Sequence, residues 1–331
     1  MNTLESLLFA INAVAPIILV VAIGYFLKRK KLISADFART ANKLVFRVFL
    51  PSMLFLNVYN IQDLGEFSFG YIGYAAAVLL AVFALGLPSV MLFTRRGDRR
   101  GALLQAIFRS NYALIGIPLT GALCGHEAES VATLLSVVSI PLLNVLAVIS
   151  LSLFRDDVGK TGVKRILLDI VKNPLILSVL AGLATLGVRA LLVRYGITFR
   201  LQQIEPVYKA LEHLSKLATP LALLMLGAQF EFSAIASLRR EIIFGTVART
   251  LVVPLIGIGT AFLFFRDVFE GAHFASFVAM FATPVAVSSV PMAQEMKADA
   301  ELAGQLVVWS TLISGATIFL AAFLLRKAGI F

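Results

Sequence analysis

Two stretches of the chain decide its fold. Residues 108–119 read FRSNYALIGIPL, and residues 281–292 read FATPVAVSSVPM. They align without a gap and share a phenylalanine, a hydroxyl residue, an alanine, a pair of small residues and a proline. Both stretches are mainly apolar, and both carry residues that break helices. The pairing predicts an internal repeat in which each half contains one interrupted helix.

Two shorter matches occur in the same order along the chain. Residues 15–19 (APIIL) resemble residues 173–177 (NPLIL), and residues 49–51 (FLP) resemble residues 218–220 (ATP). Apolar helices often resemble one another by chance, but three matches in one order favour a duplication. If each half has five spanning helices, an odd number, the second half must lie upside down relative to the first.

The composition is that of a membrane protein. Of 331 residues, 59% are hydrophobic and 15% are charged, and the mean hydropathy is +0.91. A soluble domain has roughly 45–50% apolar and about 25% charged residues. Long runs such as residues 13–27 (AVAPIILVVAIGYFL) are apolar on every side, whereas barrel strands would alternate apolar and polar residues. The composition therefore predicts an integral membrane protein built of helices.

Several other classes of protein are disfavoured. One cysteine, Cys124, and three isolated histidines offer no disulfide framework and no metal-ligand spacing. No phosphate-binding loop is present, so we expect no cofactor and no ATP-driven pumping. The net charge of +10 lies in loops between apolar runs, which argues for membrane orientation and against nucleic acid. The first residues, MNTLESLLFA, lack the basic region of a cleaved signal peptide.

A spanning helix needs ~20 mostly apolar residues, and ten segments qualify. They are Leu8–Leu27, Phe37–Tyr59, Phe67–Phe93, Ala102–Cys124, Val131–Phe154, Pro174–Val193, Val207–Phe230, Ile242–Phe265, His273–Glu295 and Leu302–Leu325. The predicted fold class is thus an all-α polytopic membrane protein with ten transmembrane helices in a 5+5 inverted repeat. The repeats are residues 1–154 and 174–331, joined by a linker over residues 155–173.

Basic residues set the expected orientation. The loops after the odd-numbered helices, with the adjoining helix ends, hold eighteen Lys and Arg residues, and the opposite side holds seven. Because cytoplasmic loops carry the excess of Lys and Arg, we place the odd loops in the cytoplasm. The protein is therefore expected in the cytoplasmic (inner) membrane with both termini on the other side.

The fourth and ninth helices carry the strongest signals for a break. Pro118 follows Gly116 within the fourth helix, and Pro284 and Pro291 flank Ser288 and Ser289 in the ninth. Proline removes a hydrogen-bond donor and clashes with the preceding turn. If both helices unwind, free carbonyls and the positive ends of half-helices meet near the midplane, where they suit an anionic group. The alternative is a simple proline kink in each helix.

The stretch from Asn111 to Pro118 resembles the auxin efflux carrier family, which includes plant PIN-type auxin exporters and bacterial malonate and malate permeases. The resemblance extends over essentially the whole chain. It implies ten helices in two inverted repeats, with broken helices four and nine crossing at their prolines. It also implies a scaffold of helices 1, 2, 6 and 7 that forms a homodimer, and a transport domain of helices 3–5 and 8–10.

The resemblance assigns roles to four residues. Asn111 matches a crossover asparagine that contacts substrate, Pro118 matches the crossover proline of the fourth helix, and Pro291 is its repeat mate. Asn144 falls near a polar substrate-contacting position in the fifth helix. Two features depart from the plant members: the third helix has no acidic residue in its interior, and no long cytoplasmic loop is present.

Two arginines lie within the apolar runs, Arg109 in the fourth helix and Arg249 in the eighth. A charge at that depth is costly and usually faces a cavity or a partner. Either could attract a carboxylate substrate. Alternatively, Arg109 could extend to the cytoplasmic surface and Arg249 could bind backbone carbonyls.

Buried carboxylates are almost absent from the predicted helices, Glu212 in the charged half of the seventh being the exception. Proton exchange through a buried aspartate is therefore disfavoured, and a coupling proton or sodium ion stays open. The neutral polar candidates are Asn42, Asn57, Gln229, Ser288 and Ser289, although ordinary helix–helix hydrogen bonds are the alternative for each. The full set expected at the substrate site is Arg109, Asn111, Tyr112, Pro118, Asn144, Arg249, Thr283, Pro284, Ser288, Ser289 and Pro291.

Together these features predict a secondary carrier of small organic anions, such as malonate, malate or an auxin-like acid, embedded in the lipid bilayer. Its transport domain would move as a body past the scaffold. Two alternatives stay open. One is a membrane sensor that binds the ligand without moving it, and the other is an intramembrane enzyme, which the lack of an obvious catalytic set disfavours.

Overall fold

A computed structural model describes residues 3–60, 69–154, 168 and 170–330, with side chains from residue 15 onward except at Phe69. Within these residues every regular element is a helix, apart from one isolated β-bridge. Most of the predicted linker, residues 155–167 and 169, and the predicted start of the third helix at residues 67–68 lie outside the described residues. The prediction of an all-helical membrane protein is confirmed.

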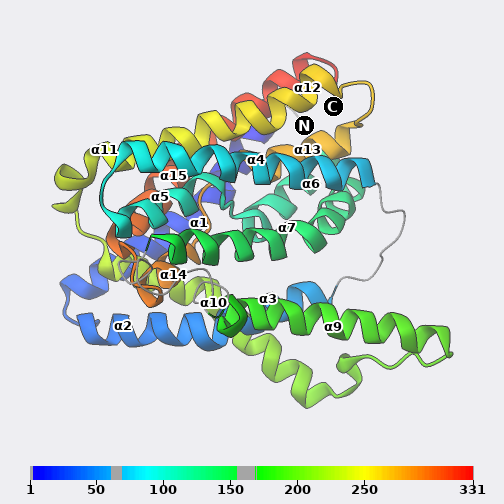
Figure 1. The fold of residues 1–331 in the computed structure, drawn as a ribbon, viewed down its shortest axis with the longest axis horizontal. Coiled ribbons are helices and arrows are strands. Elements are labelled where there is room, and N and C mark those ends of the chain that lie inside the picture. The colour runs from blue at the N-terminus through cyan, green and yellow to red at the C-terminus, as the bar shows by residue number, and fades with distance from the viewer. Residues whose placement is uncertain (1–2, 61–68, 155–167, 169, 331) are drawn as a thin grey trace.

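The described helices overlap the ten predicted segments, but the fourth and ninth segments are each divided into separate helices (Figure 1). In the first half they are α1 (Thr3–Arg29), α2 (Ala35–Leu44), α3 (Leu50–Tyr59), α4 (Phe69–Phe93), α5 (Gly97–Phe108), α6 (Ile117–Cys124) and α7 (His126–Leu153). In the second half they are α9 (Pro174–Arg194), α10 (Glu205–Gln229), α11 (Ala234–Val247), α12 (Thr260–Phe264), α13 (Gly271–Phe281), α14 (Ser289–Glu295) and α15 (Ala300–Lys327).

Six of the described helical runs are long and apolar enough to cross a membrane. They are Ala35–Tyr59, Gly70–Phe93, His126–Leu153, Pro174–Arg194, Ala234–Phe264 and Ala300–Lys327. The fourth and ninth predicted spans are interrupted, and their apolar pieces Tyr112–Cys124 and Gly271–Phe281 are each too short to cross alone. The count of ten spans therefore stays a prediction.

Three helical runs contain a π-helical turn that ends two residues before a proline. The turns are Val45–Phe49, Tyr112–Gly116 and Ala248–Val252, and the prolines are Pro51, Pro118 and Pro254. A proline ring clashes with the carbonyl four residues earlier. We attribute the tolerance of these prolines to the wider π turn, which moves that carbonyl aside and lets the run continue.

The helices pack in two groups. Helices α1, α2, α3, α9 and α10 pack mainly on one another and form the first helix group. Helices α4–α7 and α11–α15 form the second helix group. Figure 1 shows α2, α3, α9 and α10 along one edge of the molecule and α4, α6, α11 and α12 along the opposite edge. The two ends of the chain lie at the same end of the molecule in this view.

A salt-bridge cluster holds the second helix group together at the end where α5, α11 and α15 meet. Arg99 contacts Glu241 at 2.6 Å and Asp299 at 3.4 Å, and all three side chains are largely buried. Asp299 also caps α15 by accepting a hydrogen bond from the Leu302 N–H at 2.9 Å. Since Arg99 belongs to the first repeat and its two partners to the second, the cluster joins the two repeats within one packing group.

The first helix group is closed by a tight crossing of α1 and α10. Gly24 of α1 faces the backbone of Leu224, and Gly227 of α10 faces the backbone of Val21. A Cβ atom at Gly227 would lie 1.9 Å from the Val21 carbonyl oxygen, and one at Gly24 would lie 2.1 Å from that of Leu224. Neither helix can approach this closely with a side chain at the crossing.

We predict that Gly227→Ala lowers the thermal unfolding midpoint of the purified protein, because α1 and α10 must move apart. Overpacking of this kind costs about 1–3 kcal/mol. Gly73→Ala on α4 is the matched control, since nothing lies within 4 Å of an added Cβ there. Equal midpoints for the two variants would contradict the close crossing.

Candidate substrate site

The interrupted helices of the two repeats meet backbone to backbone. After α5 ends at Phe108 the chain is extended, and so is the chain between α13 and α14. The Asn111 N–H donates to the Pro284 carbonyl at 2.8 Å, and the Ala286 N–H donates to the Arg109 carbonyl at 3.1 Å. Ser110 and Val285 form the antiparallel bridge between these bonds. Asn111 and Pro284 occupy matching positions in the alignment of residues 108–119 with residues 281–292, so the two halves of the chain meet at aligned points of their interrupted helices.

The break in the fourth helix differs from the sequence-based expectation. It lies at residues 109–111 and not at Gly116–Pro118, which the π turn and α6 carry as continuous helix. Pro118 is exposed and faces away from the crossing, and its repeat mate Pro291 lies within α14. Gly116 is needed for packing, since a Cβ there would lie 2.9 Å from the Ala279 carbonyl oxygen of α13.

Arg249 binds the ends of both broken helices. Its side chain is fully buried and donates to the carbonyls of Thr283 (2.7 and 2.8 Å), Met280 (3.0 Å), Phe108 (3.3 Å) and Ile107 (3.4 Å). The last carbonyls of a helix have no partner within it and form the negative end of its dipole. Arg249 thus satisfies the C-terminal carbonyls of α5 and α13 and does not line the cavity described next, which matches the structural alternative of the sequence analysis.

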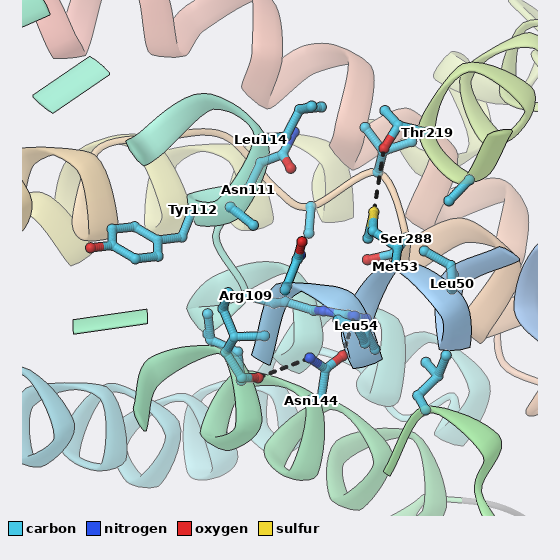
Figure 2. A pocket seen from close by; sticks show the side chains of 18 of the residues that line it. Leu50, Met53, Leu54, Arg109, Asn111, Tyr112, Leu114, Asn144, Thr219 and Ser288 are labelled. Atoms are coloured by element: carbon cyan, nitrogen blue, oxygen red, sulfur yellow. Dashed lines mark hydrogen bonds between the residues drawn. The ribbon is translucent and has the colours of Figure 1, made fainter. Parts of the chain in front are cut away.

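A cavity of about 200 Å³ lies at the crossing, between the two helix groups (Figure 2). The first helix group contributes Leu50, Met53, Leu54, Asn57, Leu175, Ala218, Thr219 and Ala222. The second contributes Arg109, Ser110, Asn111, Tyr112, Ala113, Leu114, Ile140, Leu143, Asn144, Ala286, Val287 and Ser288. Most of these side chains are apolar, with a few polar groups grouped on the side of the second helix group.

Arg109 is the one cation among the described lining residues, and none of them is acidic. The residue is 4% exposed. One guanidinium nitrogen donates to Asn144 Oδ1 at 2.9 Å and another contacts the Met292 sulfur, so both described partners are neutral. Asn144 is itself oriented by the bond from its Nδ2 to the Ile140 carbonyl, at 2.8 Å (Figure 2). A guanidinium has five N–H donors, so donors remain for a ligand.

Asn111 and Ser110 add polar groups without partners. Asn111 Nδ2 and Ser110 Oγ are buried and have no hydrogen-bond partner among the described residues. Buried polar groups are nearly always bonded, so each such atom requires an explanation. The helical run Tyr112–Cys124 begins directly after Asn111, and its first N–H groups lie at the cavity wall. A positive helix end, a buried cation and a free amide donor therefore converge on one space.

The structure brings five of the expected site residues to the cavity: Arg109, Asn111, Tyr112, Asn144 and Ser288. Of these, Tyr112 contributes mainly its backbone, because its hydroxyl points away to the Ala132 carbonyl at 2.7 Å. The other six, Pro118, Arg249, Thr283, Pro284, Ser289 and Pro291, do not line it. Among these, Thr283 and Pro284 act through their carbonyls, which accept from Arg249 and from the Asn111 N–H.

The sequence analysis missed most of the wall formed by the first helix group. Met53, Leu54 and Thr219 lie there, and Thr219 Oγ1 is 3.9 Å from the Met53 sulfur (Figure 2). Apolar residues in an apolar helix carry no individual signal. The match of residues 49–51 with residues 218–220 includes Thr219 and lies close to Met53, so it is the one sequence feature that pointed to this wall.

A cluster of amides forms a second contact between the groups, at the end of the molecule where α2 begins. Asn42 Nδ2 of α2 donates to Gln229 Oε1 of α10 and to Gln294 Oε1 of α14, each at 2.9 Å. Asn42 is fully buried. Nearby, the bond from Lys28 at 3.0 Å lowers the pKa of the Glu231 carboxyl. The bond from Asn42 to Gln294 thus joins the two helix groups through polar side chains.

The fold and the cavity define a polytopic helical membrane protein with a polar site where two broken helices cross. A family model described as "Membrane transport protein" matches residues 9–164 and 160–321. The chain therefore belongs to this family, the auxin efflux carrier family, as its sequence indicated. It is a membrane transporter.

Similar proteins bear transporter names. An "Uncharacterized transporter" of Methanothermobacter thermautotrophicus is 24% identical over 314 residues, which cover 92% of this chain and 94% of that protein. "Uncharacterized transporter YfdV" of Escherichia coli K12 is 26% identical over 256 residues, covering 75% of this chain and 77% of that protein. The similarity extends through both repeats and the crossing.

The two buried arginines are expected to respond oppositely to removal. Arg249→Leu leaves the carbonyls of α5 and α13 without donors, at about 1–3 kcal/mol for each buried group. Arg109→Leu removes a buried charge that has only neutral partners, and such a replacement is often neutral or stabilising.

Thermal unfolding midpoints of the two variants and the parent, measured in the same detergent without added anion, test this difference. We expect a lower midpoint for Arg249→Leu and an unchanged or higher one for Arg109→Leu. A lower unfolding midpoint for Arg109→Leu than for Arg249→Leu would show that Arg109 stabilises the fold.

Proposed function

We propose that this transporter is a secondary carrier of small organic anions and that the carboxylate binds in the cavity at the crossing. One observation carries the proposal: Arg109 lies buried at the cavity, and its described partners are neutral. A charge held inside a membrane protein without a counter-ion is expensive. An incoming carboxylate supplies the missing negative charge and can pair with the guanidinium through two parallel bonds.

The surrounding groups fit the same ligand. Asn111 Nδ2 and the first N–H groups of Tyr112–Cys124 are further donors for a carboxylate, and Ser288 is a hydroxyl neighbour. The volume of about 200 Å³ is below the range of roughly 300–1,000 Å³ that holds drug-sized ligands. A malonate- or malate-sized acid therefore fits the proposal better than an aromatic acid.

Movement of the second helix group past the first would expose the cavity to each side of the membrane in turn. The crossing, Arg249 and Arg109 all belong to the second group, so the polar half of the site can move as one body. At the cavity the first group contributes chiefly apolar side chains, whereas the bond from Asn42 to Gln294 would have to break as the groups move. This is an elevator-type cycle, with the first group as a scaffold that would form a homodimer through its exposed apolar surface on α9.

The coupling ion and the orientation belong to the same proposal. Since none of the described lining residues is a carboxylate, a coupling proton would travel on the substrate's own carboxyl group, and a sodium ion is the alternative. The proposed location is the cytoplasmic membrane, with the ends of α1, α5 and α15 that carry Lys28, Arg99 and Asp299 facing the cytoplasm.

Counterflow in proteoliposomes tests the proposal without an imposed gradient. Vesicles preloaded with one carboxylate are placed in labelled malonate, malate or indole-3-acetate. We expect label to accumulate with malonate or malate preloads, and the label to be recovered chemically unchanged. Asn111→Ala should lose about tenfold in initial rate, since a lost hydrogen bond to a charged group is worth ~1.5–3 kcal/mol.

Ser89→Ala on α4 is the control, because its hydroxyl bonds only to the Leu85 carbonyl of its own helix. Parental counterflow by a correctly inserted Asn111→Ala would overturn the site. Binding of malonate without any accumulation would favour a sensor over a carrier.

A further inference from the structure

A long apolar groove lies on the second helix group and shares no lining residue with the substrate cavity. It runs between α15 and the helical run formed by α11, its π turns and α12, and its volume is about 420 Å³. It is lined by Thr250, Leu251, Pro254, Leu255, Ile258, Gly259, Phe262, Thr317, Leu320, Ala321, Leu324, Leu325 and Ala328. Apart from two threonines, every lining side chain is apolar, so the groove offers almost nothing to a polar solute.

The irregular backbone of the helical run creates the groove. Two π turns, Ala248–Val252 and Leu255–Gly259, flank Pro254, and a side chain at Gly259 would meet only open space. The flanking leucines stay exposed, with Leu255 at 71% and Leu324 at 53%. The hollow is therefore a surface feature of the protein in its hydrocarbon environment and is not filled by its own side chains.

The groove has the length of one lipid chain. From Thr250 to Phe262 the run rises ~18 Å at 1.5 Å per residue. One leaflet of a bilayer contributes about half of a hydrocarbon core of ~30 Å. An acyl chain of one leaflet can therefore lie along the groove. Because its lining is almost entirely apolar, the groove suits hydrocarbon and not a polar ligand.

One end of the groove is basic. Arg266 donates to the carbonyl of Ala328, a lining residue, at 2.7 Å, and its guanidinium lies 5.2 Å from the ring centre of Phe262, another lining residue. Arg326 and Lys327 immediately precede Ala328, whereas Asp267 is the single acidic residue next to Arg266 in the sequence. Figure 1 shows α12 beside the C-terminal end of the chain. Arg266 is therefore the basic residue that contacts the lining residues at this end of the groove.

We propose that this groove is a binding site for an anionic phospholipid, with one acyl chain along α12 and α15 and the phosphate at Arg266. The charge at the mouth selects an anionic headgroup over a zwitterionic one, because basic residues near the membrane surface attract anionic lipids. The site lies on the second helix group alone, so it would move with that group in the proposed transport cycle.

The test compares lipids added to the delipidated protein in detergent. We expect phosphatidylglycerol to raise the thermal unfolding midpoint more than phosphatidylcholine of the same chain length, and to be retained as a bound mass in native mass spectrometry. Arg266→Gln should remove most of this difference. Arg240→Gln should keep it, since Arg240 lies over the Phe93 ring in a similar way but at the far end of α11.

A second variant tests the acyl-chain groove separately from the headgroup position. Gly259→Leu should fill the groove and abolish the bound phosphatidylglycerol mass, while Gly73→Leu, which also meets open space, should not. Equal shifts with the two lipids, parental selectivity in Arg266→Gln, or an equal shift with glycerol phosphate alone would each overturn the proposal. Should Gly259→Leu fail to fold, the two arginine variants still decide it.

Discussion

The architecture depends on one buried interaction, the bonds from Arg249 to the last carbonyls of α5 and α13. Two helices that stop in the middle of a membrane leave backbone groups for which hydrocarbon offers no partner. Part of this cost is met by the short antiparallel pairing of Asn111 with Pro284 and of Arg109 with Ala286. Arg249 satisfies the last carbonyls of α5 and α13, and the negative ends of these two helix dipoles stabilise its charge.

The two buried arginines therefore have different roles. With Arg249 occupied by carbonyls, Arg109 is left as the cation of the cavity, where its described partners are a methionine sulfur and the Asn144 amide oxygen. The helix that starts at Tyr112 adds its positive end on the same side. The site is therefore electropositive because of its own backbone as well as its side chains. In the proposed function that property suits a small carboxylate, and the crossing would move as part of one body.

The composition of the sequence predicts the helical membrane fold, its repeat pattern predicts the paired breaks, and the resemblance places Asn111 and Asn144 at the substrate site. Both residues line the cavity together with Ser288. The sequence could not locate the break in the fourth helix, because the π turn over Tyr112–Gly116 lets the helix continue through Pro118. Whether that turn forms depends on the packing of Gly116 against Ala279, which the sequence does not show. Nor could it separate Arg109 from Arg249, since the carbonyls that bind Arg249 come from residues up to 142 positions away. Met53 carries no individual signal, because an apolar wall resembles any lipid-facing surface, and Thr219 is marked only by the match of residues 49–51 with 218–220.

The most direct test of this account is equilibrium binding of malonate to the purified protein by titration calorimetry, comparing the parent with Arg109→Gln. The account predicts saturable binding by the parent and an affinity lower by about 10- to 100-fold in the variant, as expected for loss of a charged hydrogen bond. The variant should unfold at the same temperature as the parent when no anion is present. Parental affinity in a folded Arg109→Gln would contradict the claim that this unpaired charge makes the substrate site.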